Sequence, residues 1–338
     1  MSRPVRISYW VVGIAFIVIA WLHMTSAMLA VFFCYLVITK LHFVKNRWVA
    51  VGLFVIVLAV IGYFLVHFIG QSMRAFPVIA ETAVPSFIEW AEQNLKLELP
   101  FTDWASLRTL ILETLRDQKH DLADLRNFAN VAKTVSTKAI GIIIGAVVAA
   151  SIFMNSKLDL DEGRHVVTNN LYSLICRELA LRFSSLYRSF ATVMGAQMVI
   201  SGINTALTSV FIFAVSLPYA PLVIGVTFLC GLLPVVGNLM SNTVIVAIAF
   251  TVSPQMALAA LIFLVVIHKL EYFLNSKIIG DRIKNPVWLT LVGLIIGERL
   301  MGIPGMIMAP VVLNYIKVEM SRIAIAERET DKPGAAAA

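Results

Sequence analysis

Charged residues are scarce in this chain, and their scarcity excludes an ordinary soluble domain. Asp, Glu, Lys and Arg make up 14% of the 338 residues, whereas hydrophobic residues make up 59%. Soluble domains carry about 25% charged residues. Residues 48–70 contain none of the four charged types and are long enough to span a bilayer as a helix. The sequence therefore predicts an all-α polytopic membrane protein.

Cysteines and catalytic motifs are also scarce. The three cysteines have no CxxC spacing, so neither a disulfide framework nor a zinc site is expected. The chain has no GxxxxGK(S/T) phosphate-binding loop, no HExxH motif and no nucleophile elbow. We expect no enzyme activity and no cofactor, and any transport must be secondary or facilitated. In a membrane protein, the net charge of +7 is more typical of basic loops on one side of the membrane than of a protein that binds nucleic acid.

Two long apolar stretches near the C-terminus are broken by proline and glycine. Residues 221–252 are interrupted at 233–238, and residues 286–316 are interrupted at 301–305. Unbroken helices of these lengths would run about 45–50 Å, against a hydrocarbon core of about 30 Å. Folded back at the breaks, each stretch forms a hairpin that enters the membrane without crossing it. Paired broken segments point to the binding site of a transporter, because freed backbone at membrane depth needs protein or a watery cavity around it.

Basic residues set the predicted orientation of the helices. Besides the two hairpins we expect six membrane helices, at about 8–23, 25–39, 48–71, 137–155, 190–215 and 254–274. Arginines near the N-terminus and lysines after the second helix place these segments in the cytoplasm. If the first broken segment crossed the membrane once, the basic cluster in residues 269–284 would lie outside. Two hairpins keep this cluster and the basic C-terminal tail inside, so we predict that both termini are cytoplasmic.

The predicted topology divides the chain into five parts. These are N-terminal membrane helices (1–71), an external helical insertion (72–133), a membrane helix with a cytoplasmic amphipathic helix (134–189), a transport region (190–316) and a cytoplasmic tail (317–338). Apolar residues at helical spacing predict that the amphipathic helix occupies residues 165–190, on the membrane surface. Residues 190–252 and 254–316 have the layout of an inverted repeat.

Two motifs carry a resemblance to a known family. The first is Leu233-Pro234-Val235-Val236-Gly237-Asn238, and the second runs from Asn275-Ser276-Lys277-Ile278-Ile279-Gly280 into Gly302-Ile303-Pro304-Gly305. With these motifs, residues 190–316 resemble the autoinducer-2 exporter family of bacterial inner-membrane proteins. The family usually has Glu-Pro where this chain has Asn275-Ser276. The resemblance implies a transporter with two hairpins, an elevator-like mechanism and a homopentamer in the inner membrane, and it leaves the cargo open.

The candidate binding residues lie at the two breaks and on a neighbouring helix. Backbone at a break binds a small polar ligand, unless the break is only a structural kink. The 190–215 helix carries polar residues on one face, which either line a polar cavity or bond to neighbouring helices. That face comprises Gln197, Ser201, Asn204, Thr205 and Thr208. The predicted substrate-binding residues are Pro234, Val235, Val236, Gly237, Asn238, Asn204, Asn275, Gly302, Pro304 and Gly305.

Four ionisable residues are candidate contacts for an ion or a substrate, because charge within a membrane segment is costly. They are Glu271, Lys277, Glu298 and Arg299. Lys277 could instead extend its ammonium to the membrane surface. A watery vestibule or a salt bridge between elements explains Glu298 and Arg299 equally well. His67 and His268 are isolated in the sequence and receive no role.

Three functions are compatible with these features. The first is export of a small polar organic solute, such as an autoinducer-2-like signalling molecule. The second is exchange of sodium for protons, which needs an ionisable residue at the site. The third is a membrane scaffold for envelope proteins that uses the external insertion as its docking surface and transports nothing. In each case the lipid bilayer and other copies of the chain are the expected partners, with a small solute as cargo in the first.

Overall fold

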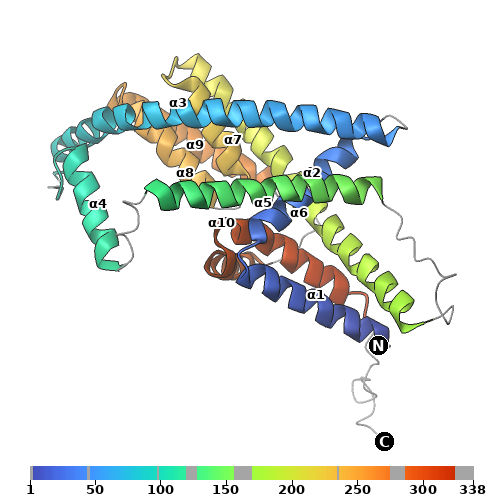
Figure 1. Ribbon diagram of the computed structural model, residues 1–338. Coiled ribbons are helices and arrows are strands. Elements are labelled where there is room, and N and C mark those ends of the chain that lie inside the picture. Colours follow the sequence, from blue (N-terminus) through green and yellow to red (C-terminus); the bar gives the residue numbers. More distant parts are fainter. Residues whose placement is uncertain are drawn as a thin grey trace, which may run out of the picture.

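The computed structural model describes residues 3–43, 46–96, 99–118, 128–155, 170–233, 236–274 and 286–323. Within these ranges the chain forms ten α-helices and no strand (Figure 1). They are α1 (Arg3–Trp21), α2 (Thr25–Leu41), α3 (Arg47–Leu95), α4 (Trp104–Gln118), α5 (Phe128–Met154), α6 (Leu171–Ala214), α7 (Ala220–Gly231), α8 (Val236–Phe250), α9 (Pro254–Leu274) and α10 (Val287–Met320). The predicted all-α fold class is confirmed.

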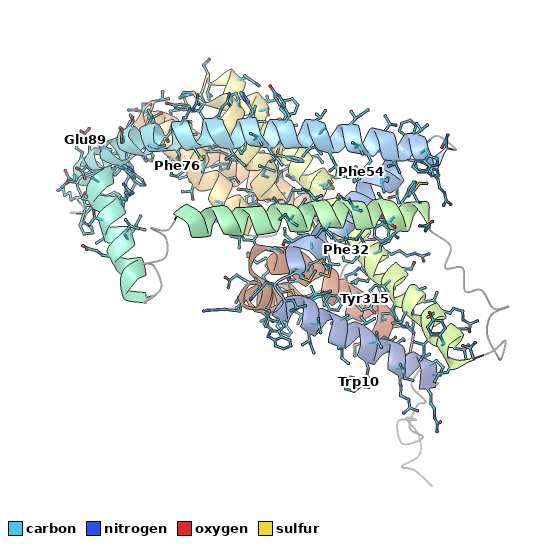
Figure 2. All side chains as sticks on the ribbon, viewed as in Figure 1. Trp10, Phe32, Phe54, Phe76, Glu89 and Tyr315 are labelled. Carbon is cyan, nitrogen blue, oxygen red and sulfur yellow. The ribbon has the colours of Figure 1, made fainter. Side chains whose placement is uncertain are left out.

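Many of these helices present apolar side chains outward. Helices α1, α3, α6, α9 and α10 are long and apolar enough to cross a membrane by length and composition, and α2, α7, α8 and residues 139–154 are shorter apolar helices. The Trp10 side chain, which is 74% exposed, points away from the neighbouring helices (Figure 2). Lipid tails are as apolar as such side chains, so outward apolar faces are stable in a bilayer. The polytopic character is confirmed, and the count of six membrane helices with two hairpins stays a prediction.

Two helices are far longer than predicted. Helix α3 continues for 49 residues, far beyond the expected end near residue 71. Helix α6 is one helix of 44 residues, so residues 171–190 of the predicted amphipathic segment and the membrane helix after it are continuous. Both begin with an asparagine cap: Asn46 accepts a hydrogen bond from the Trp48 amide, and Asn170 accepts one from the Ser173 amide. A change in polarity alters only what a helix faces, whereas ending a helix requires residues that break it.

Two separate apolar clusters hold the two ends of the molecule. Helices α2, α3 and α5 meet around Ile38, Phe54 and Phe153, and α2 and α5 approach closely because Gly145 faces Ala27 and Ala30. Helices α7, α8 and α9 pack around Val223, Ile245 and Ala260. Figure 1 shows this second group behind α3, with α1 and α10 below α5.

Helix α6 contributes to the packing at both ends. Phe190 and Met194 belong to a third cluster, with Val311 of α10, and Ile212 belongs to the α7–α9 cluster. The side chains of α6 therefore join the hairpin group to the helices around α1 and α10.

A buried ionic cluster ties α1, α6 and α10 together. Arg182 of α6 donates to the Glu319 carboxylate of α10, and it also contacts Glu178 at 3.1 Å. The Tyr9 hydroxyl donates to Glu319 Oε2 at 2.9 Å, and the Arg182 guanidinium lies 4.4 Å from the centre of the Tyr9 ring. Arg322 completes the cluster at 3.0 Å from Glu319 Oε1. The Arg182 and Glu319 side chains are only 11% and 4% exposed, so each charge depends on the other.

Removing one charge from this cluster is expected to cost much more than removing an exposed one. The substitution Glu319→Ala should lower the free energy of unfolding in mixed micelles by about 3 kcal/mol, because Arg182 stays buried with Glu178 as its only carboxylate partner among the described residues. The control is Glu298→Ala in the same helix, whose carboxylate is 55% exposed and whose loss should cost less than about 1 kcal/mol. Equal and small costs for both variants would contradict a stabilising role for the cluster.

Candidate functional site

The first predicted break lies between two short helices. Helix α7 ends at Gly231 and α8 begins at Val236, and the two helices pack against each other. A Cβ atom on Gly237 would lie 1.7 Å from the Cys230 carbonyl oxygen, so only glycine permits this approach of the two backbones. Pro234 and Val235 lie outside the described residues. Helices α7 and α8 therefore form a helical hairpin whose tip depends on Gly237.

Two polar side chains of α6 bind the carbonyls at the end of α7. Gln197 Nε2 donates to the Gly231 carbonyl at 2.6 Å, and Ser201 Oγ donates to the Phe228 carbonyl at 2.8 Å. The last carbonyls of a helix have no partner within the helix and need one elsewhere when water is absent. The polar face of α6 was predicted either to line a cavity or to bond to neighbouring helices. Gln197 and Ser201 bond to a neighbouring helix. These two side chains fix the hairpin tip against α6.

A small polar cavity lies beside this tip. Asn238 at the start of α8 donates from Nδ2 to Glu271 Oε2 of α9 at 2.5 Å, and Glu271 is only 8% exposed. The cavity has a volume of about 20 Å³, which is room for one water-sized group. Its lining residues come from α6, α7, α8 and α9 and are Asn204, Thr208, Thr227, Asn238, Ser241, Asn242, Ile245, Leu264, Ile267, His268 and Glu271.

One polar atom of this lining has no partner among the described residues. Asn204 Oδ1 is buried and accepts no hydrogen bond from them. A buried polar group without a partner is rare, because leaving it unbonded costs about 1–3 kcal/mol. The carboxylate of Glu271 and the amide oxygen of Asn204 are hard oxygen ligands, and the hydroxyls of Thr208 and Thr227 both donate and accept. The cavity can therefore bind a polar group of a solute or a small cation.

The second predicted break is a hairpin within α10. Gly302 has φ 64° and ψ −151°, a conformation that glycine alone adopts readily. A Cβ atom on Gly305 would lie 2.0 Å from the Gly297 carbonyl oxygen, and one on Gly293 would contact Ala309. These pairs are nearly symmetric about the break, so the two arms run antiparallel and in contact. Pro304 begins the returning arm, where its missing amide hydrogen removes no intrahelical bond.

The structure brings three of the predicted site residues together and leaves others apart. Asn204, Asn238 and Glu271 line the polar cavity. The residues of the second break, Gly302, Pro304 and Gly305, are not part of that lining, and neither is Val236. Glu298 and Arg299 are 55% and 85% exposed, and their charged groups are 4.0 Å apart, a pair that contributes little. Asn275 and Lys277 lie outside the described residues.

Several lining residues were missed in the sequence. His268, which received no role there, lines the cavity together with Thr227, Ser241 and Asn242. The sequence does contain a signal for these residues. On each of two helices, the lining residues are spaced at i, i+3, i+4 and i+7, so they lie on one face. On α8 this spacing joins Asn238, Ser241, Asn242 and Ile245, and on α9 it joins Leu264, Ile267, His268 and Glu271.

The close approach at the first tip predicts a specific sensitivity to substitution. The change Gly237→Ala should destabilise the protein by about 1–3 kcal/mol, because the new methyl group displaces α8 from the Cys230 carbonyl. Gly202→Ala in α6 is the matched control, since a Cβ there meets nothing within 4 Å and should be neutral or stabilising. Both are measured by unfolding in mixed micelles. Equal stabilities of the two variants would contradict the tip geometry.

Comparison with known proteins finds a family match over most of the chain. Residues 7–324 match the family described as "AI-2E family transporter". Over 167 residues the chain is 27% identical to the "Putative transport protein YdbI" of Bacillus subtilis (strain 168). That alignment covers 49% of this chain and 48% of the relative, so the chain spans about half the length of the curated relative it matches. Because the family match extends over most of the chain, this protein belongs to the AI-2E transporter family.

Proposed function

We propose that this protein is a secondary or facilitated transporter that exports a small polar organic solute. The polar cavity formed by α6, the α7–α8 hairpin and α9 has room for one water-sized group and binds one polar group of that solute. The observation that carries this proposal is the buried Asn238–Glu271 hydrogen bond, which joins the hairpin tip to α9 beside the unpartnered oxygen of Asn204. Membership of the AI-2E family supports an autoinducer-2-like cargo.

The hairpins of this transporter are re-entrant. Helices α7 and α8 have 12 and 15 residues, which correspond to lengths of about 18 and 22 Å. A hydrocarbon core is about 30 Å thick, so neither arm is long enough to cross it. The arms of α10 on either side of Gly302 are similarly short. Each hairpin thus enters and leaves the bacterial inner membrane on its own side, the first from outside and the second from the cytoplasm, and both termini are cytoplasmic.

Membership of the AI-2E family supports an elevator-like movement. Helices α2 and α5 share one apolar cluster and α7, α8 and α9 share another, while α3 contributes Phe54 to the first and Ile79 to the second. The transport region, residues 190–316, carries the polar cavity past a scaffold built from residues 1–71 and 134–189. The external insertion (72–133) and the cytoplasmic tail (317–338) flank this machinery. Five copies of the chain assemble around the scaffold helices.

Sodium–proton exchange is the second candidate function. It is favoured by the burial of the Glu271 carboxylate in a cavity with room for one water-sized group. A carboxylate with amide and hydroxyl oxygens around it is a typical ligand set for a hard cation, and a buried carboxylate also carries protons. The two functions differ in what they require of Glu271, because only proton exchange needs its charge.

The topology predicts which residues an impermeant reagent reaches. In a variant lacking the three native cysteines, Lys277→Cys and Lys317→Cys should resist an impermeant maleimide added outside intact cells. Thr109→Cys in the external insertion is the positive control and should be labelled under the same conditions. After the membrane is permeabilised, both test positions should react. Labelling at position 277 in intact cells would refute the double-hairpin arrangement.

The binding site predicts a set of transport phenotypes in proteoliposomes. Asn238→Leu removes a hydrogen bond to a buried charge and should reduce autoinducer-2 flux by about tenfold or more. Glu271→Gln keeps the size of the side chain and removes its charge, so it should abolish sodium-driven proton movement if the protein exchanges cations. Glu298→Gln is the control and should preserve flux, because that carboxylate lies away from the cavity. If Asn238→Leu transported both autoinducer-2 and sodium at the wild-type rate, the proposed binding site would be wrong.

A further inference from the structure

A second and much larger cavity lies on the other side of α8. It has a volume of about 770 Å³ and is bounded by α3, the start of α4, α8 and α9. It lies at the end of the molecule where α3 leads into α4, the end marked by Glu89 in Figure 2. Cavities of about 300–1,000 Å³ are the usual size for small-molecule sites. We call this cavity the α8–α9 groove.

The face of α8 in this groove changes from polar to apolar along its length. Asn238, Asn242 and Thr243 lie at one end, and Val246 and Phe250 lie at the other. Twelve residues of helix separate the first from the last, a distance of about 18 Å. At the apolar end, Phe250 packs edge-on against Phe87 of α3 with ring centres 5.5 Å apart. The groove is therefore amphipathic along its axis.

Helix α9 shows the same change in the same direction. It runs back from the short turn after α8, so its last turns lie beside the start of α8. His268 and Lys269 of α9 face the groove near that polar end, whereas Leu261, Leu264 and Val265 face its apolar part. Two antiparallel helices thus place their polar groups at one end and their apolar groups at the other.

The polar end carries a positive charge. Lys269 is exposed in the groove and forms no ion pair with any described residue. The nearby carboxylate of Glu271 is bound by Asn238 in the small cavity and is not part of the groove lining. An ammonium beside two amides attracts an anionic group that accepts hydrogen bonds, and the apolar end favours a hydrocarbon.

We propose that the α8–α9 groove binds a long-chain carboxylate, with its head at Lys269 and Asn242 and its hydrocarbon chain between α8, α9 and Phe87. Burial of the chain contributes about 0.8 kcal/mol for each methylene removed from water, and Lys269 selects the anionic head. This site does not depend on the proposed transport function. Because Asn238, Asn242 and His268 line both cavities, the bound head lies next to the candidate transport site.

Photolabelling of the full chain in nanodiscs of neutral phospholipid tests this site. The probe is palmitic acid with a diazirine in the middle of its chain, and the comparison probe is the matching alcohol. Mass spectrometry should locate the label on α8 and α9 between residues 246 and 265. Lys269→Gln should reduce labelling by the acid about tenfold at subsaturating probe and leave labelling by the alcohol unchanged. Arg74→Gln, outside the groove lining, should change neither.

A variant that fills the groove provides a second test of the proposal. Ala247→Trp should block labelling by both probes, because the indole occupies the space between α8 and α9, whereas Ala206→Trp on the exposed side of α6 should not. Labelling that is spread over other lipid-facing helices, or that does not respond to Lys269→Gln and Ala247→Trp, would overturn the proposal. So would cross-links showing that a second copy of the chain fills the groove. These outcomes are independent of the transport assays, which measure flux through the smaller cavity.

Discussion

The structure depends on satisfying the backbone of a helix that stops within apolar surroundings. The carbonyls at the end of α7 need donors, and Gln197 and Ser201 of α6 supply them. These bonds explain two of the polar residues in an otherwise apolar part of α6. They also fix the position of the tip, where Gly237 lets the start of α8 approach α7. The contact of Asn238 with Glu271 follows from that position.

One short helix then separates two cavities of different chemistry. Ser241 and Ile245 of α8 face the small polar cavity, while Leu239 and Thr243 face the larger groove. A shift of α8 would change both cavities together, because Asn238 and Asn242 line each of them. Under the proposed elevator-like mechanism, a ligand in the groove would therefore be coupled to cargo in the small cavity without a separate regulatory domain.

Local chain chemistry allowed much of this fold to be predicted from the sequence. The breaks at 233–238 and 301–305 were visible because proline and glycine interrupt apolar runs, and the structure has a helical hairpin at each. Asn204, Asn238 and Glu271, which line one cavity in the structure, were singled out as polar side chains within or beside apolar segments. The full lengths of α3 and α6 were missed because polarity changes do not end helices. The position of His268 in the cavity lining was missed because only tertiary packing shows which face of α9 meets α8.

The most direct test of the binding site is protection of Asn242→Cys from alkylation, in a chain lacking the native cysteines. Asn242 lines both the polar cavity and the α8–α9 groove, so bound cargo should cover the new thiol at this position but not one at Thr243→Cys, which lines the groove alone. The rate of reaction with a small permeant thiosulfonate is measured with and without autoinducer-2. It is also measured in sodium chloride and, for comparison, in choline chloride. The account predicts slower reaction with the transported species at Asn242→Cys and no change at the exposed control Ala206→Cys. Active transport of a species that leaves the reaction at Asn242→Cys unchanged would contradict it.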